Sequence, residues 1–149
     1  MRRSISVIFS ALFLLASCCE PTSSNVFLKS SERDAFGRYE YKLDMSDSLH
    51  AYDIFFYTRL DASVRDFTTM GDIPLSVRMY NPAGICYEEK VFIPVDKPSF
   101  STAFSRQYKA LYRKDSTPSV YGEWTMQVEI PDFDISGCMT GLGVEITKK

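Results

Sequence analysis

Hydrophobic residues alternate with polar ones in several separate segments of this chain, and this period of two restricts the fold more than any other feature. Such alternation is typical of β-strands that bury one face against a core. The alternating segments cover residues 37–45, 73–80, 121–131 and 142–147. Each of them is followed or preceded by turn residues, so we expect neighbouring strands to run antiparallel.

Two further segments complete the predicted sheets. Residues 51–60 are apolar on both sides and rich in aromatic residues, which indicates a central strand. Residues 85–94 follow the turn Asn81-Pro82-Ala83-Gly84 and form the second half of a hairpin. We therefore predict an all-β fold, an antiparallel β-sandwich of about seven strands that is immunoglobulin-like or jelly-roll-like. Trp124 is in phase with the apolar residues of its segment, and we expect it between the sheets.

Residues 95–119 interrupt the alternation. Within them, four apolar side chains follow the spacing of one helix face, namely Phe104, Tyr108, Leu111 and Tyr112. We predict a short helix over residues 103–113. It serves either as a partner-binding element or as a cover for an open sheet edge. The four side chains are the candidate partner-binding residues, because long connections on a rigid sandwich are where binding residues concentrate.

The beginning of the chain predicts its location. Arg2 and Arg3 precede an apolar run, and the small residues Ala16 and Ser17 come directly before Cys18. This pattern is typical of a secretory signal that ends in a bacterial lipobox, with Cys18 as the lipidated residue. The apolar run is shorter than the roughly 20 residues that a membrane-spanning helix needs. We predict an outer-membrane lipoprotein held by acyl chains on Cys18, on either the periplasmic or the outer face.

These observations divide the chain into three parts. Residues 1–17 are the predicted signal peptide, residues 18–35 a polar lipidated tether, and residues 36–149 the sandwich domain. Within the tether, Val26-Phe27-Leu28 is an apolar exception that suits a short first strand. The hydrophobic content of 45% is ample for a packed core, and the net charge of −2 argues against a nucleic-acid partner.

The sequence offers little for catalysis or metal binding. His50 is the single histidine and lies in a turn-like segment, where we expect an exposed side chain. The cysteines have no zinc-site spacing, so we predict neither a metal nor another cofactor, and no enzymatic activity. Cys86 and Cys138 either form a disulfide or remain as two buried free thiols.

Several other residues have a structural and a functional interpretation. The pairs Asp44/Asp47 and Asp132/Asp134 suit either a two-carboxylate site or simple turn chemistry, and turns explain them better. Arg59 is expected to pair with Asp61 or Asp66. Exposed tyrosines on a sandwich can stack on sugar rings or anchor an interface, and they can equally be half-buried packing residues. The tyrosines expected on outer faces or loops are Tyr57, Tyr80, Tyr87, Tyr108 and Tyr112.

Taken in order, the motifs resemble one family. They are the lipobox, the strand Tyr52-Asp53-Ile54-Phe55-Phe56-Tyr57-Thr58-Arg59, the Asn81–Gly84 turn, the strand Gly122-Glu123-Trp124, and an ending that contains Gly137, Gly141, Leu142, Gly143 and Ile146. The chain resembles the gliding-motility lipoprotein family (the H member) of Bacteroidetes. The resemblance implies a lipid-anchored protein in an envelope complex and supplies no catalytic residue. The C-terminal glycines are expected to permit a bulge or a close backbone approach beside the last strand.

Two functions follow from these patterns. The first is a non-enzymatic interaction module that binds a protein partner in the cell envelope, as in a gliding-motility-like complex. The second is a glycan-binding sandwich associated with nutrient uptake. A flat apolar patch with a polar rim would favour the first function. An exposed row of aromatic rings in a shallow groove would favour the second.

Overall fold

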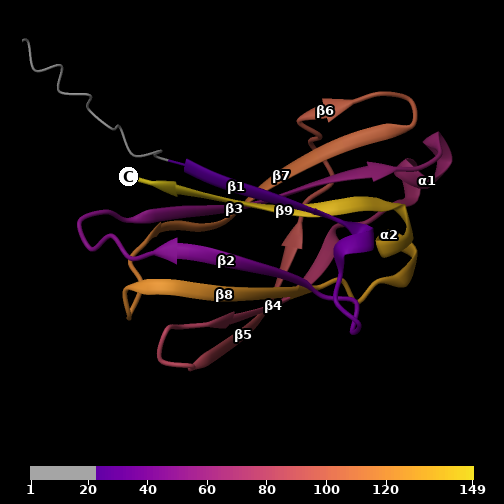
Figure 1. The fold of residues 1–149 in the computed structure, drawn as a ribbon. Coiled ribbons are helices and arrows are strands. Elements are labelled where there is room, and N and C mark those ends of the chain that lie inside the picture. Colours follow the sequence, from indigo (N-terminus) through magenta and orange to yellow (C-terminus); the bar gives the residue numbers. More distant parts are fainter. Residues whose placement is uncertain (1–22) are drawn as a thin grey trace, which may run out of the picture.

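The alternating segments form strands that place their apolar side chains between two sheets. The structure, a computed structural model, describes residues 23–149. Within that range nine strands form a five-stranded and a four-stranded antiparallel sheet, packed face to face (Figure 1). The all-β sandwich is therefore confirmed, with more strands than the sequence predicted.

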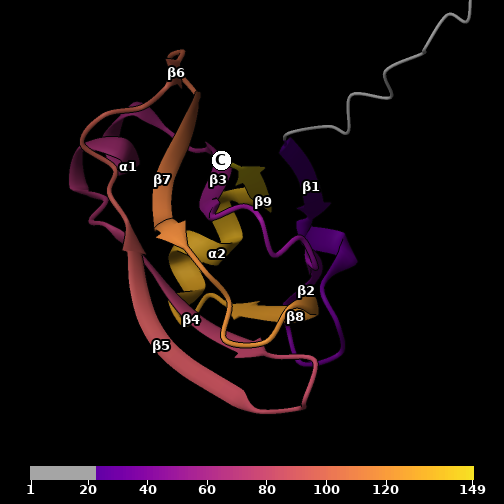
Figure 2. The same cartoon turned by 90° about the vertical axis from the view of Figure 1, so that its left-hand side faces the viewer.

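The five-stranded sheet has the order β1-β9-β3-β7-β6. Its central strand is β3, as residues 51–60 predicted. The strand bounds are β1 Ser23–Lys29, β3 Tyr52–Asp61, β6 Phe100–Ser101, β7 Ser105–Ser116 and β9 Met139–Lys148. Figure 2 shows this sheet above the other one, with β6 rising at its edge.

The four-stranded sheet has the order β2-β8-β4-β5. Its strands are β2 Tyr39–Met45, β4 Ile73–Tyr80, β5 Cys86–Ile93 and β8 Gly122–Glu129. In β2 and β4, every second residue is buried, as their alternation predicted. The β4–β5 turn also follows the prediction, because Gly84 adopts a φ of 82° and its N–H donates to the Asn81 carbonyl over 2.9 Å.

The core lies between the sheets and contains many large side chains. Trp124 is 7% exposed and its indole N–H donates to the Val120 carbonyl over 2.8 Å, so its predicted burial is confirmed. Tyr41 is buried and donates to the Leu142 carbonyl of the opposite sheet over 2.7 Å. Burial raises the pKa of Tyr41 far above its usual value, which keeps this hydroxyl a donor.

Two short helices and one 3₁₀ turn close one end of the sandwich. They are η1 Ser30–Glu32, α1 Val64–Thr69 and α2 Phe133–Cys138. Ser63 and Asp66 form a capping box on α1, and Asp132 accepts from the Ile135 N–H at the start of α2. The turn interpretation of Asp132 is thereby confirmed.

The predicted helix over residues 103–113 is wrong, because this segment belongs to β7. The segment carries two periods at once, since Tyr108, Ala110 and Tyr112 also alternate. In the folded chain β7 pairs along β3, which would otherwise present a bare edge there. Pairing with a neighbouring strand outweighs a local helical pattern.

The predicted tether over residues 18–35 is too long. Ser23–Lys29 is strand β1, paired with β9 from Ser23↔Thr147 to Lys29↔Gly141, and η1 follows it. The apolar exception at Val26–Leu28 marked this strand, which begins earlier than those three residues. The sandwich therefore includes Ser23–Lys29 and starts well before Phe36.

Candidate functional site

The most unusual surface of the sandwich is the outer face of its five-stranded sheet. In β9, Leu142 and Val144 point inward and are buried, so Gly141 and Gly143 occupy the outer positions between them. Glycine has no side chain to cover the sheet. The neighbouring strands fill this space from both sides.

Two aromatic rings lie over these glycines. A methyl group built on Gly143 would overlap the Tyr57 ring, and one built on Gly141 would lie 2.7 Å from the Phe27 ring. Phe27 comes from β1 and Tyr57 from β3, and both pair with Gly143 in register. The two ring centroids are 5.8 Å apart and the ring planes differ by 27°. We call Phe27 and Tyr57 the aromatic platform.

The platform lies in an open groove. Its volume is about 610 Å³, and hydrogen-bonding side chains surround the rings. They are Asn25, Lys29, Arg59, Ser99, Gln107, Lys109, Thr140 and Glu145. Ser99 directly precedes β6, which rises beside the sheet in Figure 2 and bounds the groove on that side. Phe27 is 39% exposed, so a ligand in this groove can reach its ring.

The charges beside the platform are mostly paired. The Lys109 ammonium donates to Glu145 over 2.8 Å and lies 4.6 Å from the Phe55 ring centroid. Arg59 donates to Asp61 over 3.0 Å, so the predicted pairing of Arg59 is confirmed. Hydrogen bonds from Ser105 and Arg59 hold the pKa of Asp61 below its usual value. Desolvation, aided by the Glu145 carboxylate, raises the pKa of Tyr57, which keeps its hydroxyl protonated.

A second, smaller pocket lies between the sheets and has a volume of about 270 Å³. Trp124 and Tyr87 stack in its wall with centroids 5.9 Å apart. The Tyr112 hydroxyl donates to Glu89 over 2.5 Å, and Arg113 pairs with the same carboxylate. These polar groups bind one another, so the pocket offers a ligand mainly apolar contact.

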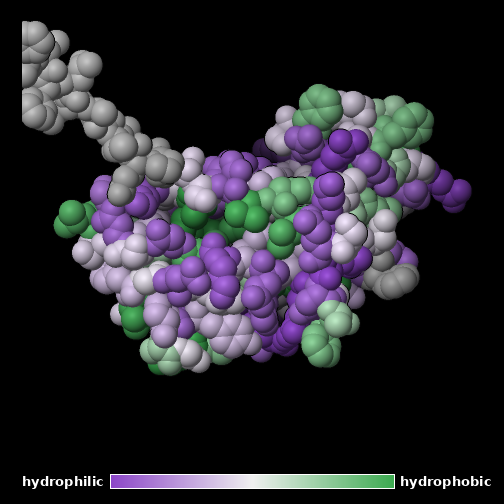
Figure 3. Space-filling model, viewed as in Figure 1, coloured by the Kyte–Doolittle hydropathy of each residue, from purple (hydrophilic) through white to green (hydrophobic). Residues whose placement is uncertain are grey.

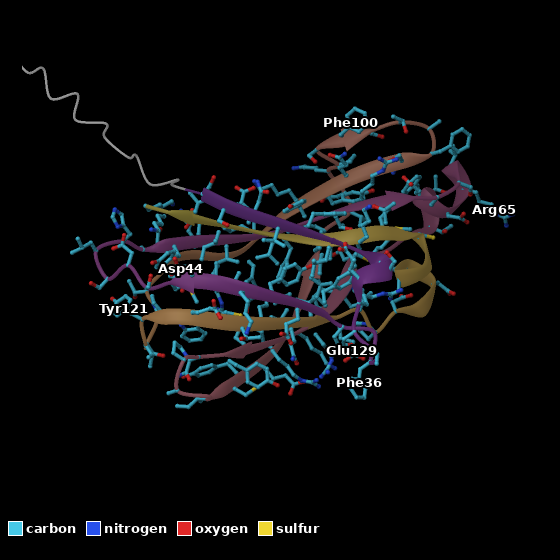
Figure 4. The ribbon with its side chains drawn as sticks, in the orientation of Figure 1. Phe36, Asp44, Arg65, Phe100, Tyr121 and Glu129 are labelled. Atoms are coloured by element: carbon cyan, nitrogen blue, oxygen red, sulfur yellow. The ribbon has the colours of Figure 1, made fainter. Side chains whose placement is uncertain are left out.

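The four side chains predicted to form one partner-binding face are divided by the strand. Tyr108 points into the core and is 2% exposed, and Tyr112 is half-buried against Phe56. Leu111 points outward and is 49% exposed, whereas Phe104 lies before β7 and is 68% exposed. Figure 3 shows hydrophobic side chains on the hairpin of β6 and β7, and Figure 4 labels Phe100 at the start of β6. Only Phe104 and Leu111 remain available to a partner.

Cys86 and Cys138, the two cysteines among residues 23–149, do not pair. Cys86 and Cys138 are free thiols, the first exposed on β5 and the second half-buried at the end of α2. The disulfide is therefore wrong, and the alternative of two buried thiols is also wrong for Cys86. Cys18, the predicted lipidation site, lies outside the described residues.

The acidic residues near the first turn have structural roles. Asp47 accepts from the Leu49 N–H over 2.9 Å and from His50 Nδ1 over 2.8 Å. His50 is exposed, as expected. Hydrogen bonds from Ser46 hold the pKa of Asp44 below its usual value.

Among residues 23–149, no group of three metal-ligating side chains is close enough to hold an ion, and no helix is long and apolar enough to cross a bilayer.

Comparisons with known proteins add the following findings. No family model matches the chain, and no curated protein matches it. A crystal structure of a protein from Sulfurospirillum deleyianum is 10% identical, covers 87% of this chain and 98% of its own, and has a TM-score of 0.40. A mitogen derived from Yersinia pseudotuberculosis is 9% identical, covers 84% of this chain and 82% of its own, and has a TM-score of 0.36. Similarity this low carries no argument about function.

Sequence reasoning missed Phe27 as a site residue and gave the C-terminal glycines a folding role only. The predicted close backbone approach is found at Gly141, where an added Cβ would meet the Leu28 carbonyl, and the predicted bulge corresponds to a register irregularity between Arg59 and Leu60. The spacing Gly141-Leu142-Gly143 was the available signal, because it puts both glycines on one face of a strand.

Proposed function

We propose that this chain is a lipid-anchored, non-enzymatic binding protein of the cell envelope, and that the outer face of its five-stranded sheet binds a glycan. The aromatic platform is the observation that carries the proposal. Ring atoms of Tyr57 and Phe27 lie over the Cβ positions of Gly143 and Gly141, and both side chains line the open groove. The C–H face of a sugar ring stacks on an aromatic face.

The surroundings of the platform fit the rest of a sugar. Asn25 and Gln107 offer both donors and acceptors at the groove, and Ser99 adds a hydroxyl. The two ion pairs, Lys109–Glu145 and Arg59–Asp61, balance their own charges, and Lys29 adds one positive charge to the groove. A neutral glycan is compatible with this single charge. The distance between the two ring centroids is comparable to the spacing of adjacent sugar rings in an extended glycan.

The anchoring part of the proposal rests on the lipobox. Lipid on Cys18 would hold the sandwich at the outer membrane, where more than one acyl chain gives stable attachment. Cys18→Ala should move the protein from the membrane fraction to the soluble fraction. Retention of the variant in the membrane fraction would contradict the lipoprotein proposal.

Affinity electrophoresis tests the glycan site. The full chain, in mild detergent, is run in native gels that contain laminarin, xylan, mannan or starch. We expect retardation by at least one of them, and Phe27→Ala or Tyr57→Ala should weaken binding by about tenfold or more, which is ~1.4 kcal/mol.

Two control variants sharpen this test. Tyr57→Phe should retain most of the binding, because the ring remains. Leu111→Ala removes an exposed apolar side chain from the same sheet two strands away from β9, and should bind as the native chain does. Equal loss in Leu111→Ala and Tyr57→Ala, or no retardation by any of the four polysaccharides, would contradict the proposed site.

A protein partner is the second candidate. Phe100 and Phe104 on the β6–β7 hairpin are 53% and 68% exposed, and they form the apolar surface that favours this function. It is also the function that the resemblance to gliding-motility lipoproteins implies. If Phe104→Asp abolishes co-purification of an envelope protein while the platform variants bind normally, the interaction module becomes the better account.

A further inference from the structure

The short distance between Cys18 and the sandwich restricts how the domain can stand on a membrane. This step rests on the lipidation of Cys18 proposed above. The sandwich includes Ser23, so at most five residue steps separate it from the lipidated cysteine. Five steps of chain span at most about 17 Å. The ten residues of β9 span about 33 Å, so the tether is much shorter than the domain.

The start of β1 lies at one particular end of the sandwich. Ser23 pairs with Thr147, and Tyr52 pairs with Lys148, which places the β2–β3 loop at the same end. Met45 pairs with Gly122, so the β7–β8 loop is there too, and the β4–β5 turn touches it through Pro82. Figure 4 shows Asp44 and Tyr121 at this end and Phe36, Arg65 and Glu129 toward the other. We call the loops 46–51, 81–85 and 117–121 the tether end.

The tether end presents apolar side chains from three separate loops. Leu49 is 88% exposed, Ile85 is 54% exposed and Tyr121 is 44% exposed. Leu49 has the largest exposed fraction among the exposed large hydrophobic residues of the described chain. Tyrosine is enriched at membrane interfaces, where its ring contacts acyl chains and its hydroxyl reaches water.

Several charges at the tether end are paired, which lowers the cost of bringing these groups to a bilayer. Asp47 contacts His50 over 2.8 Å and lies 3.7 Å from the Lys148 ammonium. The Lys149 ammonium lies 2.7 Å from Asp53 and 3.2 Å from Asp115. Partial removal of water from these groups leaves no carboxylate among them without a nearby cation.

We infer that the sandwich stands end-on on the bilayer that holds its lipid, with Leu49, Ile85 and Tyr121 in the interfacial region. Exposed apolar side chains alone do not select this end, because Phe36 at the other end is 77% exposed. The length of the tether distinguishes the two ends, because Ser23 at the tether end must lie within about 17 Å of the lipidated cysteine. End-on attachment leaves the groove on the outer sheet face open to ligands.

Fluorescence quenching by lipids tests the orientation. The full lipidated chain is reconstituted into phosphatidylethanolamine/phosphatidylglycerol vesicles that contain lipids with a nitroxide near the headgroup end of the acyl chain. Leu49→Trp and Phe36→Trp are compared, each with the native buried Trp124 as a common background. Both replaced side chains are highly exposed, so neither substitution disturbs the core.

We expect at least twofold stronger quenching of Leu49→Trp than of Phe36→Trp, with a blue-shifted emission for Leu49→Trp alone. Equal quenching, or stronger quenching of Phe36→Trp, overturns the end-on orientation. Flotation of the same vesicles separates the two proposals. If the native chain floats and Cys18→Ala does not, a failed quenching result contradicts the orientation only. If Cys18→Ala also floats, the lipid anchor fails, and the orientation fails with it.

Discussion

The two faces of β9 differ in what their residues do. On the inner face, Leu142, Val144 and Ile146 are large, buried and packed into the core. On the outer face, Gly141 and Gly143 leave the backbone bare, and rings from β1 and β3 cover it. Core packing explains the inner residues completely. The outer arrangement places two aromatic rings in an open groove, which is why we place the binding site there.

Substitutions on the inner face should have the largest effect on stability. Phe56 is 1% exposed on β3 and packs against Tyr112, and Phe56→Ala should lower the free energy of unfolding by about 3–5 kcal/mol. Urea denaturation followed by circular dichroism measures this. A loss below about 1 kcal/mol would mean that the inner face is not the packed core described here.

The two outer glycines should differ from one another. A side chain on Gly141 meets the Leu28 carbonyl of β1 as well as the Phe27 ring, and backbone cannot move as a ring can. Gly141→Ala should therefore cost about 1–3 kcal/mol and loosen the β1–β9 pairing. Amide hydrogen exchange of β1 should increase in this variant. Unchanged exchange in β1 would contradict the contact.

Acid should weaken the start of β3 on its outer face. A hydrogen bond from Lys149, with a second from the Asp115 N–H, holds the pKa of Asp53 below its usual value. The pKa of Asp53 is lower in the folded chain than in the unfolded chain, where it is about 3.9. The stabilisation is therefore complete at a pH above the unfolded-chain pKa, and it is lost as the pH falls through the folded-chain pKa. Asp53→Asn should flatten the decrease of the urea midpoint below pH 4. An unaltered slope would mean that Asp53 contributes nothing to acid sensitivity.

The smallest effect is expected at the exposed ion pair beside the platform. Arg59 and Asp61 have side chains that are 50% and 46% exposed, and such pairs contribute about 0–1 kcal/mol. Arg59→Ala should leave the thermal midpoint almost unchanged. A large decrease would show that this part of the outer face is structural.

The sequence predicted the inner face better than the outer one. Alternation located β4 to the residue and β2 to within two residues at its start, because burial of one face leaves a local pattern that needs no knowledge of the partner strand. Alternation did not identify β7, because Tyr108 and Tyr112 fit the spacing of a helix and of a strand equally. Pairing with β3 determines that this segment is a strand. The platform depends on the register of three strands distant in sequence, so Phe27 could not be assigned to it even though the spacing of Gly141 and Gly143 was visible.

Gly143→Ala is the measurement that tests most directly whether the outer face serves binding rather than stability. The three atoms nearest to the added methyl group all belong to the ring of Tyr57, a side chain that can move, so the platform should be displaced while the fold remains. Isothermal titration with the polysaccharide that retards the native chain, together with urea denaturation of the same sample, gives both quantities. We expect about tenfold weaker binding and a change in unfolding free energy below about 1 kcal/mol. Undiminished binding, or a loss of stability as large as that of Phe56→Ala, would contradict the account.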